Sequence, residues 1–330
     1  MSVFRFPCHR RWATLLEVAL ACLVTVACLS RVETIPGAST AVPLSLEVPT
    51  LDRVGRLTYR GGLELQGDAG FGGLSSLSVL GDGNRFVAVS DVGAVIAGRL
   101  GYDDTGRLTE AGNFTTEPLL LEDGASEGKR GHDSEGLTRL PDGGWVVSFE
   151  RHHRLLRYPR DFGRSGEPPV PLAVPPGLED APDNGGAEAV TTLADGRLLV
   201  LQEGAGGAEH PAWVGDGRRW ERLAYRPERR FRPTDAAMLP DGDVLVLERR
   251  ASFAGGFGAR IVRLKAAALR AGAVLEGEEL ARLGPPLTID NFEGIAVQPG
   301  ADGEVRVWIV SDNNFSVFQR TLLLMFTLKS

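Results

Sequence analysis

The side chains that could do chemistry in this chain are mostly carboxylates, and they recur at two positions of a repeated motif. One position opens each copy of the motif, and the other follows the short apolar run that closes it. The opening set is Asp133 with Glu135, Asn184 with Glu188, Asp235, and Asn291 with Glu293. The closing set is Asp91, Glu150, Glu203, Glu248, and Asp312 with Asn313. A turn-rich scaffold explains the Asp-Gly turns between them, but not a recurrent acid after the second apolar run.

Carboxylates that converge on one place repel one another unless a cation lies between them or their pKa values rise. A set of oxygen donors without Cys and with few His suits Ca²⁺ first, then Mg²⁺ or Mn²⁺, rather than zinc. Such an ion polarises a phosphoryl or acyl oxygen and activates water, and a further carboxylate can act as general base. We therefore predict metal ligands at Asp91, Asp133, Glu150, Glu203, Asp235, Glu248, Asn291 and Asp312, and catalytic groups at Glu135, Glu188, Glu293 and His132.

Arginines beside these acids are the candidate substrate-binding groups. Guanidinium groups can orient a phosphate or carboxylate through two hydrogen bonds, and the candidates for this are Arg151, Arg249, Arg250 and Arg320. We assign substrate binding to Arg151, Arg249 and Arg320, with Asn313. The alternative is that the arginines pair with the neighbouring acids, and that the acids are solvated residues at strand ends. Ser75 and Ser76 lie in no Gly-x-Ser-x-Gly motif, so a serine hydrolase is disfavoured.

The elements that must position these groups are hairpins. "EGLTRLPDGGWVVSFE", "EAVTTLADGRLLVLQE" and "TDAAMLPDGDVLVLE" each place an Asp-Gly turn between two apolar runs, and related copies begin at Ser75 and Glu293. Asp-Gly between alternating apolar runs is a strong hairpin signal, because Gly tolerates the positive φ of tight turns. The copies begin 60, 53, 46 and 59 residues apart. A strand-based period near 50 residues is typical of a β-propeller with four-stranded blades.

The spacing leads us to expect an all-β protein with six blades in one domain, 56–330. Five blades come from the visible copies, and we expect Leu57–Leu65 to meet Thr321–Leu328 in a sixth blade that closes the ring. Closure matters because an open ring would leave bare strand edges. We interpret Lys265–Leu280 as a helix-like insertion between strands.

The first 28 residues have the pattern of a signal peptide. Arg5, Arg10 and Arg11 precede an uninterrupted small and apolar run, Val18–Leu29, which is too short to span a bilayer comfortably. "TVAC" is similar to a lipoprotein cleavage box, so lipidation at Cys28 competes with plain cleavage, and an uncleaved anchor is a third alternative. Residues 29–55 are expected to form a tether with a first strand. We expect an exported protein of a Gram-negative bacterium, in the periplasm or as an outer-membrane lipoprotein.

Composition restricts the partners. The formal net charge is -7, and the chain has no cluster of basic residues that could neutralise phosphates, so nucleic acid is excluded as a partner. We expect a monomer that acts on a small phosphate ester or similar substrate and touches a membrane only through an N-terminal lipid anchor.

Several motifs are similar to those of a known family. "NGGAEAVTTLADGRLLVLQE", "NFEGIAV" and "SDNNFSVFQRTLLLMFTL" resemble the phytase-like domain family named for the esterase-like activity of phytase, over roughly residues 55–329. The resemblance implies an exported bacterial β-propeller whose acids act in phosphoesterase or phosphodiesterase-like chemistry. The motif acids correspond to Glu135, Glu188, Asp235, Glu248, Glu293 and Asp312, whereas Ser75 stands where an acid is expected in the first copy.

Three functions follow as hypotheses. The first is a divalent-cation-dependent phosphate-ester hydrolase at the mouth of the propeller channel. The second is a calcium-dependent lactonase or carboxylic-ester hydrolase. The third is a non-catalytic propeller of the cell envelope that binds a ligand or protein, with ions held only for structure.

Overall fold

The computed structural model describes residues 38–68, 70–122, 131–164, 166–204, 207–252, 255–300 and 303–329. These residues belong to one compact unit, Thr34–Ser330. The predicted signal peptide, the predicted lipidation at Cys28 and the start of the predicted tether fall on residues outside the described ones. Within the part of the chain that is described, no helix is long and apolar enough to cross a membrane.

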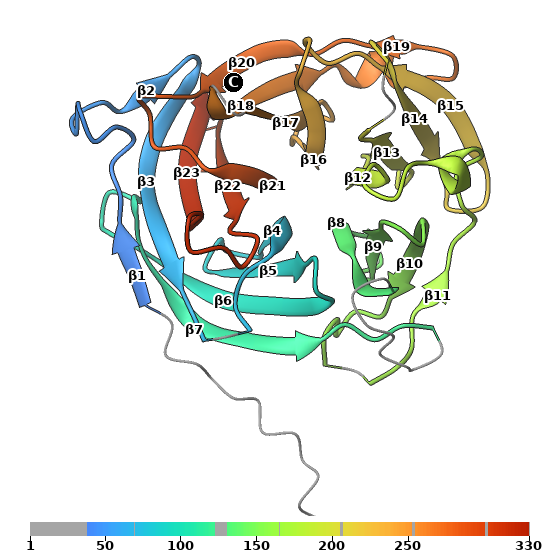
Figure 1. Cartoon of the computed structure of the whole chain (residues 1–330), viewed down its shortest axis with the longest axis horizontal. Helices are drawn as coiled ribbons and strands as arrows, with labels where there is room; N and C mark the ends of the chain where they lie inside the picture. Colours follow the sequence, from blue (N-terminus) through green and yellow to red (C-terminus); the bar gives the residue numbers. More distant parts are fainter. Residues whose placement is uncertain are drawn as a thin grey trace, which may run out of the picture. The chain divides into compact units, whose positions relative to one another are not determined.

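Five antiparallel sheets, here called blades 1 to 5, surround a common centre (Figure 1). Blade 1 contains β4 (Leu74–Leu80), β5 (Arg85–Ser90), β6 (Ala94–Tyr102) and β7 (Leu108–Pro118). Blade 2 contains β8 (Ser134–Arg139), β9 (Trp145–Phe149), β10 (Arg154–Tyr158) and β11 (Val170–Pro171). Blade 3 contains β12 (Ala187–Thr192), β13 (Leu198–Gln202), β14 (His210–Gly215) and β15 (Trp220–Tyr225), with β19 (Val274–Leu275) added in parallel.

Blade 4 contains β16 (Arg232–Met238), β17 (Val244–Ser252), β18 (Gly256–Leu264) and β20 (Glu278–Leu283). Blade 5 contains β21 (Asn291–Pro299), β22 (Glu304–Asp312), β23 (Thr321–Lys329) and β3 (Leu57–Gln66), extended by β1 (Ala38–Ala41) and β2 (Arg53–Val54). Two short 3₁₀ turns, Leu178–Asp180 and Ala266–Ala268, lie in connections. The first strand of each sequence repeat is the innermost strand of its blade, so β4, β8, β12, β16 and β21 surround the centre.

The two ends of the domain close the ring, as the sequence predicts. Strand β3 pairs with β23 from Leu57 opposite Leu328 to Leu65 opposite Thr321. The expectation of six blades is wrong: the structure has five. The hairpin β21–β22 supplies only the two inner strands of its blade, and β23 and β3 are the outer strands that complete it. The terminal strands therefore finish the fifth repeat and leave none for a sixth.

The Asp-Gly turns have the geometry that their sequence implies. Gly143, Gly196 and Gly242 have φ values of 88°, 84° and 90°. In each turn the preceding Asp accepts a hydrogen bond from a backbone N–H two residues onward, as Asp142 does from Gly144 at 2.9 Å. The side chain thus stabilises the turn that the glycine permits.

Apolar side chains fill the space between neighbouring blades. Trp213, Trp308, Phe149 and Phe326 are all at most 1% exposed. Replacing such a side chain by Ala typically costs about 3–5 kcal/mol, so packing between blades holds the inner strands rigidly around the centre. The predicted helix-like insertion Lys265–Leu280 is wrong, because this segment forms one 3₁₀ turn and then enters β19 and β20.

Candidate functional site

Each inner strand has a β-bulge or irregular pairing near its start. In each blade the pairing with the second strand skips at this point, as between Ala187 and Ala189 in blade 3. Bulges re-aim side chains and are frequent beside functional sites. The skipped residues are Ser75, Glu188, Thr234 and Glu293 in blades 1, 3, 4 and 5, and Glu135 with Gly136 in blade 2. Ser75, Glu135, Glu188 and Glu293 line the pocket described below, whereas Thr234 does not.

The second strand of each blade supplies a matching position. On the second strand, the matching position is the residue that follows the partner of the last inner-strand residue before the skip. In blades 1 to 5 this residue is Asp91, Glu150, Glu203, Arg249 and Asp312. Blades 1, 2, 3 and 5 contribute acids here, whereas blade 4 contributes an arginine. We call these five residues, together with Ser75, Glu135, Glu188, Thr234 and Glu293, the channel ring.

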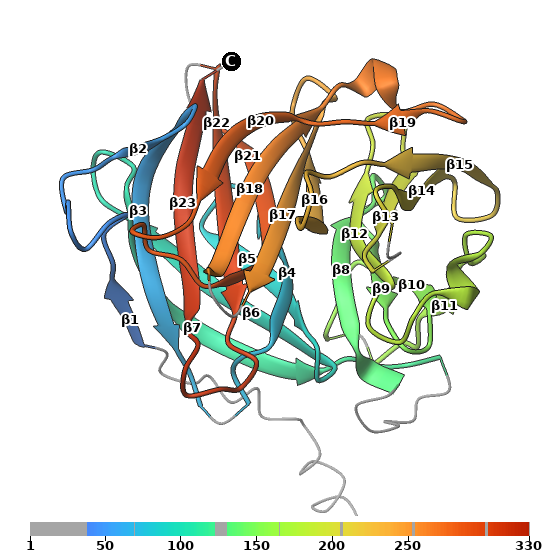
Figure 2. The ribbon, with the colours of Figure 1, turned by 45° about the horizontal axis from the view of Figure 1, so that its top comes forward.

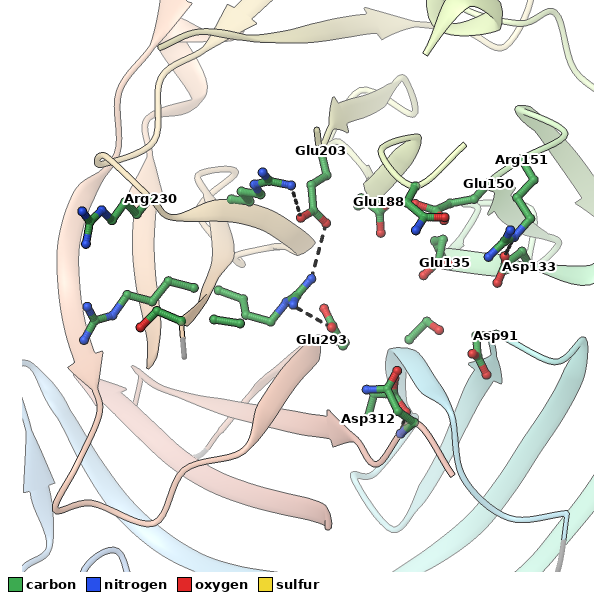
Figure 3. A pocket seen from close by; sticks show the side chains of 18 residues that line it. Asp91, Asp133, Glu135, Glu150, Arg151, Glu188, Glu203, Arg230, Glu293 and Asp312 are labelled. Carbon is green, nitrogen blue, oxygen red and sulfur yellow. Dashed lines mark hydrogen bonds and ion pairs between the residues drawn. The ribbon is translucent and has the colours of Figure 1, made fainter. Parts of the chain in front are cut away.

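The channel ring opens into a pocket of about 770 Å³. Its walls consist of Ser75, Asp91, Asp133, Glu135, Glu150, Arg151, Asn184, Glu188, Glu203, Arg230, Arg232, Arg249, Arg250, Ala251, Ser252, Glu293, Asp312 and Asn314. Figure 3 shows Asp133, Glu135 and Glu150 grouped on one side and Arg230 on the opposite side, with Glu203 and Glu293 between. The pocket is therefore acidic at one wall and basic at the other.

The acidic wall contains a compact cluster from blade 2. One carboxylate oxygen each of Asp133, Glu135 and Glu150 lie within 4.8 Å of one another. Asp133 forms an ion pair with Arg151, and its backbone oxygen accepts the Glu150 N–H at 2.8 Å. Burial, and then the charges of Glu150 and Asp133, raise the pKa of Glu135 well above its ordinary value. A cation among these oxygens would relieve that repulsion.

Glu188 extends the cluster into blade 3. Burial raises the pKa of Glu188 well above its ordinary value, and the charge of Glu135 and a hydrogen bond with the Glu150 carboxyl raise it further. Its Oε1 is buried and has no hydrogen-bond partner. A buried polar atom without a partner costs free energy, so Glu188 presents a free acceptor to whatever the pocket holds.

Blade 4 places a partly buried cation, Arg249, among these acids. The Nε of Arg249 lies 3.1 Å from Glu293 Oε1 and one of its terminal nitrogens lies 3.6 Å from Glu203 Oε2. Burial opposes the charge of Arg249, but Glu293 and Glu203 outweigh it and raise the pKa of Arg249. Burial raises the pKa of Glu293 to about 8 even though Arg249 lowers it. Arg232 also contacts Glu203, at 3.3 Å.

The structure brings together ten of the residues predicted from sequence. Glu135, Glu188, Glu293, Arg151, Arg249, Asp91, Asp133, Glu150, Glu203 and Asp312 all line the pocket. The pocket lining does not include His132, Asp235, Glu248, Asn291, Asn313 or Arg320.

Asp235 and Glu248 are displaced by one residue from the channel ring. Asp235 follows the bulge residue Thr234, and its Oδ2 accepts hydrogen bonds from Ser76 Oγ and the Ile295 N–H, both at 2.8 Å. Glu248 precedes Arg249, and its carboxylate accepts hydrogen bonds from Tyr225 and Arg260, both at 2.6 Å. Both acids hold buried polar groups of the scaffold together, and neither belongs to the pocket lining.

The other four predicted residues support the site from outside. Asn291 donates a hydrogen bond to Glu293 Oε1 at 2.8 Å, and the buried His132 packs against Gly93. Asn313 Oδ1 accepts the Gly73 N–H at 3.1 Å. Arg320 lies 3.5 Å from Asp290 and 3.9 Å from Glu64.

Two arginines of the basic wall, Arg230 and Arg232, were missed as substrate-binding candidates, whereas Arg250, a candidate from its sequence, lines the pocket with them. Counting from the turns would have identified the register of blade 4. Glu135 and Glu188 lie seven residues before the Asp of their turns, and Glu150 and Glu203 lie eight residues after it. The same count from Asp241 reaches Thr234 and Arg249.

The donor set fits a hard divalent cation. The cluster offers carboxylate oxygens only, and Glu188 adds an acceptor that lacks a hydrogen-bond partner. Oxygen-only sets of this kind suit Ca²⁺, Mg²⁺ or Mn²⁺. Asp133, Glu135 and Glu150 are the residues that would hold the ion.

Comparison with known proteins gives one informative match. The family model described as "Phytase-like: Esterase-like activity of phytase" matches residues 69–315. No curated protein sequence matches the chain.

Similar solved structures are remote. A Dyadobacter fermentans protein of unknown function is 13% identical with a TM-score of 0.45, covering 90% of this chain and 96% of that one. The PQQ-bound aldose sugar dehydrogenase of Streptomyces coelicolor is 14% identical with a TM-score of 0.44, covering 88% of this chain and 98% of that one. A putative gluconolactonase is 14% identical with a TM-score of 0.37, covering 88% and 99%. We infer nothing about chemistry from these likenesses.

Proposed function

Because the chain belongs to the phytase-like family, whose description is esterase-like activity of phytase, we propose that it hydrolyses phosphate esters with a divalent cation in the pocket. One observation carries the proposal. The three carboxylates of Asp133, Glu135 and Glu150 cluster on one wall of a pocket whose opposite wall contains arginines. A phosphate ester bound to a cation needs both an oxygen-lined cation site and nearby positive charge.

The cation would lie among Asp133, Glu135 and Glu150, and we favour Ca²⁺. When bound, a divalent cation polarises a phosphoryl oxygen and lowers the pKa of a bound water. The ion pair between Asp133 and Arg151 keeps that carboxylate in place. Glu188, with a buried Oε1 that has no hydrogen-bond partner, is placed to accept a proton from the attacking water.

The basic wall would bind the substrate phosphate. Arg249 is partly buried and positioned by Glu203 and Glu293, so its guanidinium can hold a phosphoryl oxygen without large rearrangement. Arg230, Arg232 and Arg250 line the same wall further out. Burial raises the pKa of Glu293 to about 8, which suits this carboxyl to the role of general acid toward a leaving oxygen.

The test is hydrolysis of bis(4-nitrophenyl) phosphate and 4-nitrophenyl phosphate at pH 7.5 with Ca²⁺, Mg²⁺ or Mn²⁺. The expected result is cation-dependent release of nitrophenol, abolished by EDTA and reduced by about a thousandfold in Glu135→Gln. Glu110→Gln, an exposed acid of β7, is the matched control and should leave the rate unchanged.

Two other outcomes would replace the proposal. Turnover of lactones or carboxylic esters without phosphate-ester hydrolysis would identify a calcium-dependent lactonase. Cation binding with no turnover on either panel would indicate a non-catalytic propeller that binds a ligand or protein.

We also propose that the first 28 residues, which lie outside the described residues, direct export to the periplasm or outer membrane. Signal-peptide processing in a Gram-negative host would test this proposal.

A further inference from the structure

The loop between β22 and β23 exposes three large apolar side chains beside the pocket. Val317 and Phe318 are 93% and 92% exposed, and Phe315 is 44% exposed. They are the most exposed large apolar group on any single described loop, and neither Val317 nor Phe318 is needed to build the channel ring. We call residues 313–319 the apolar loop.

The apolar loop adjoins the pocket directly. Asp312 and Asn314 line the pocket. Phe315 Cε2 and Asp91 Oδ1 both lie within 3 Å of the position that a Cβ on Gly73 would occupy. The Phe315 ring is therefore at the pocket rim, and Val317 and Phe318 project beyond it into solvent.

The loop is held in an ordered conformation. Asn313 Oδ1 accepts the N–H groups of Gly73 and Phe315, both at 3.1 Å. The Asn314 side chain donates to Gln319 Oε1 at 2.7 Å. Phe315 has a φ of 49°, which is costly for a bulky side chain and is maintained by these hydrogen bonds. A preformed tip loses little conformational entropy when its apolar side chains enter another phase.

The N-terminal end of the described chain reaches the same face. Ala38 in β1 pairs with Gln66, at the end of β3 where Leu65 pairs with Thr321, just after the apolar loop. Figure 2 shows β1 and the β22–β23 connection at the same end of blade 5. Nine residues separate Ala38 from Cys28, where lipidation is one of the alternatives for the leader, and nine residues span at most about 32 Å.

We propose that the apolar loop inserts into a lipid bilayer, so that the pocket faces the membrane surface. Exposed Phe and aliphatic side chains partition into the boundary between headgroups and acyl chains. Residues 313–320 contain no acid and end in Arg320, so the loop itself carries no negative charge toward the headgroups. A protein partner would need an apolar area on the order of 800 Å² on each side, whereas this surface is a narrow tip of three side chains.

This inference does not depend on the proposed hydrolysis, because binding to lipid can be measured without turnover. The compact unit 34–330, which contains the closed ring of blades and lacks the leader, is mixed with phosphatidylcholine vesicles in EDTA and sedimented. We expect it to co-sediment, and Val317→Ser with Phe318→Ser to weaken the partitioning by at least about tenfold. The control pair Val170→Ser and Val174→Ser removes exposed valines from the outer edge and should bind as the parent does.

A second variant reports on insertion directly. Phe318→Trp should gain a blue-shifted emission component with vesicles, whereas Val170→Trp should not. Absence of vesicle binding by the parent, or unchanged binding by the double serine variant, would overturn the proposal. A concentration-dependent dimer that the serine variant loses, without vesicle binding, would assign the loop to a contact between copies and would also overturn it.

Discussion

Blades 2 and 4 carry nearly the same repeat, yet they bring opposite charges to the pocket. In blade 2 the bulge residue Glu135 and the strand-end residue Glu150 join Asp133 in one acidic cluster. In blade 4 the corresponding positions are Thr234 and Arg249. A shift of one residue along each strand changes an acid from a pocket residue to a scaffold residue, because neighbouring side chains of a strand point to opposite faces.

This difference predicts that Glu248 and Glu150 contribute very different amounts to the free energy of unfolding. Glu248→Ala in blade 4 should lower the free energy of unfolding by about 3–4 kcal/mol, because Arg260 and the hydroxyl of Tyr225 lose a buried partner. Glu150→Ala in blade 2 should lower it by less than about 1 kcal/mol without metal, because it removes a repelling charge. Urea unfolding in EDTA measures both. Equal losses would mean that both acids have the same structural role.

The pH dependence of the free energy of unfolding tests the raised pKa of Glu293, the acid that contacts Arg249. The pKa of Glu293 is about 8 in the folded protein, above its unfolded value. The folded state therefore binds the extra proton between about pH 4.5 and 8, and this contribution to stability falls as pH rises through that window. We expect a decline on the order of a few kcal/mol in EDTA. Glu293→Gln should flatten it, and a slope unchanged in this variant would contradict the assignment.

Arg249 should contribute more to catalysis than to folding. Arg249→Gln removes the partly buried cation that contacts Glu203 and Glu293, and should reduce kcat/KM for a phosphodiester about a hundredfold, or about 2.7 kcal/mol. The exposed Arg218→Gln is the matched control. If the arginine substitution left kcat/KM unchanged, the basic wall would have no part in the reaction.

The smallest effect is expected at the edge of the basic wall. Arg232 is half-exposed, and its 3.3 Å contact with Glu203 is open to solvent. Such pairs contribute about 0.2–1 kcal/mol, so Arg232→Gln should change kcat/KM by about threefold or less. A loss as large as that of Arg249→Gln would show that charge, rather than burial and positioning, determines the role of the basic wall.

The strands and the ring closure were predictable from sequence because hairpin signals are local. Asp142-Gly143 indicates a turn whatever lies around it. The two terminal apolar segments, Leu57–Leu65 and Thr321–Leu328, were expected to pair because an unpaired segment would leave a bare strand edge. The number of blades was not predictable from the visible repeats, because assigning β3 and β23 to the fifth repeat depends on which edge they pair with. That choice is made by long-range packing.

The candidate site was predictable in composition but not in register. Acid-rich repeats led to Glu135, Glu188 and Glu293, whereas Asp235 and Glu248 were assigned to the ring by their charge. Each lies one residue from the ring position, so its side chain points to scaffold partners. Arg230 enters the pocket from a segment that carries no recurring motif, and only the assembled blade brings it there.

The most direct test of the cation site is a calorimetric titration of residues 34–330 with Ca²⁺. The account predicts binding that Glu135→Gln weakens by at least about a hundredfold. Glu248→Gln, the acid of similar sequence context in blade 4, should leave the affinity within about threefold of the parent, provided that the variant is shown to be folded. Undiminished binding by Glu135→Gln, or loss of binding in folded Glu248→Gln, would contradict the assignment of the cation to blade 2.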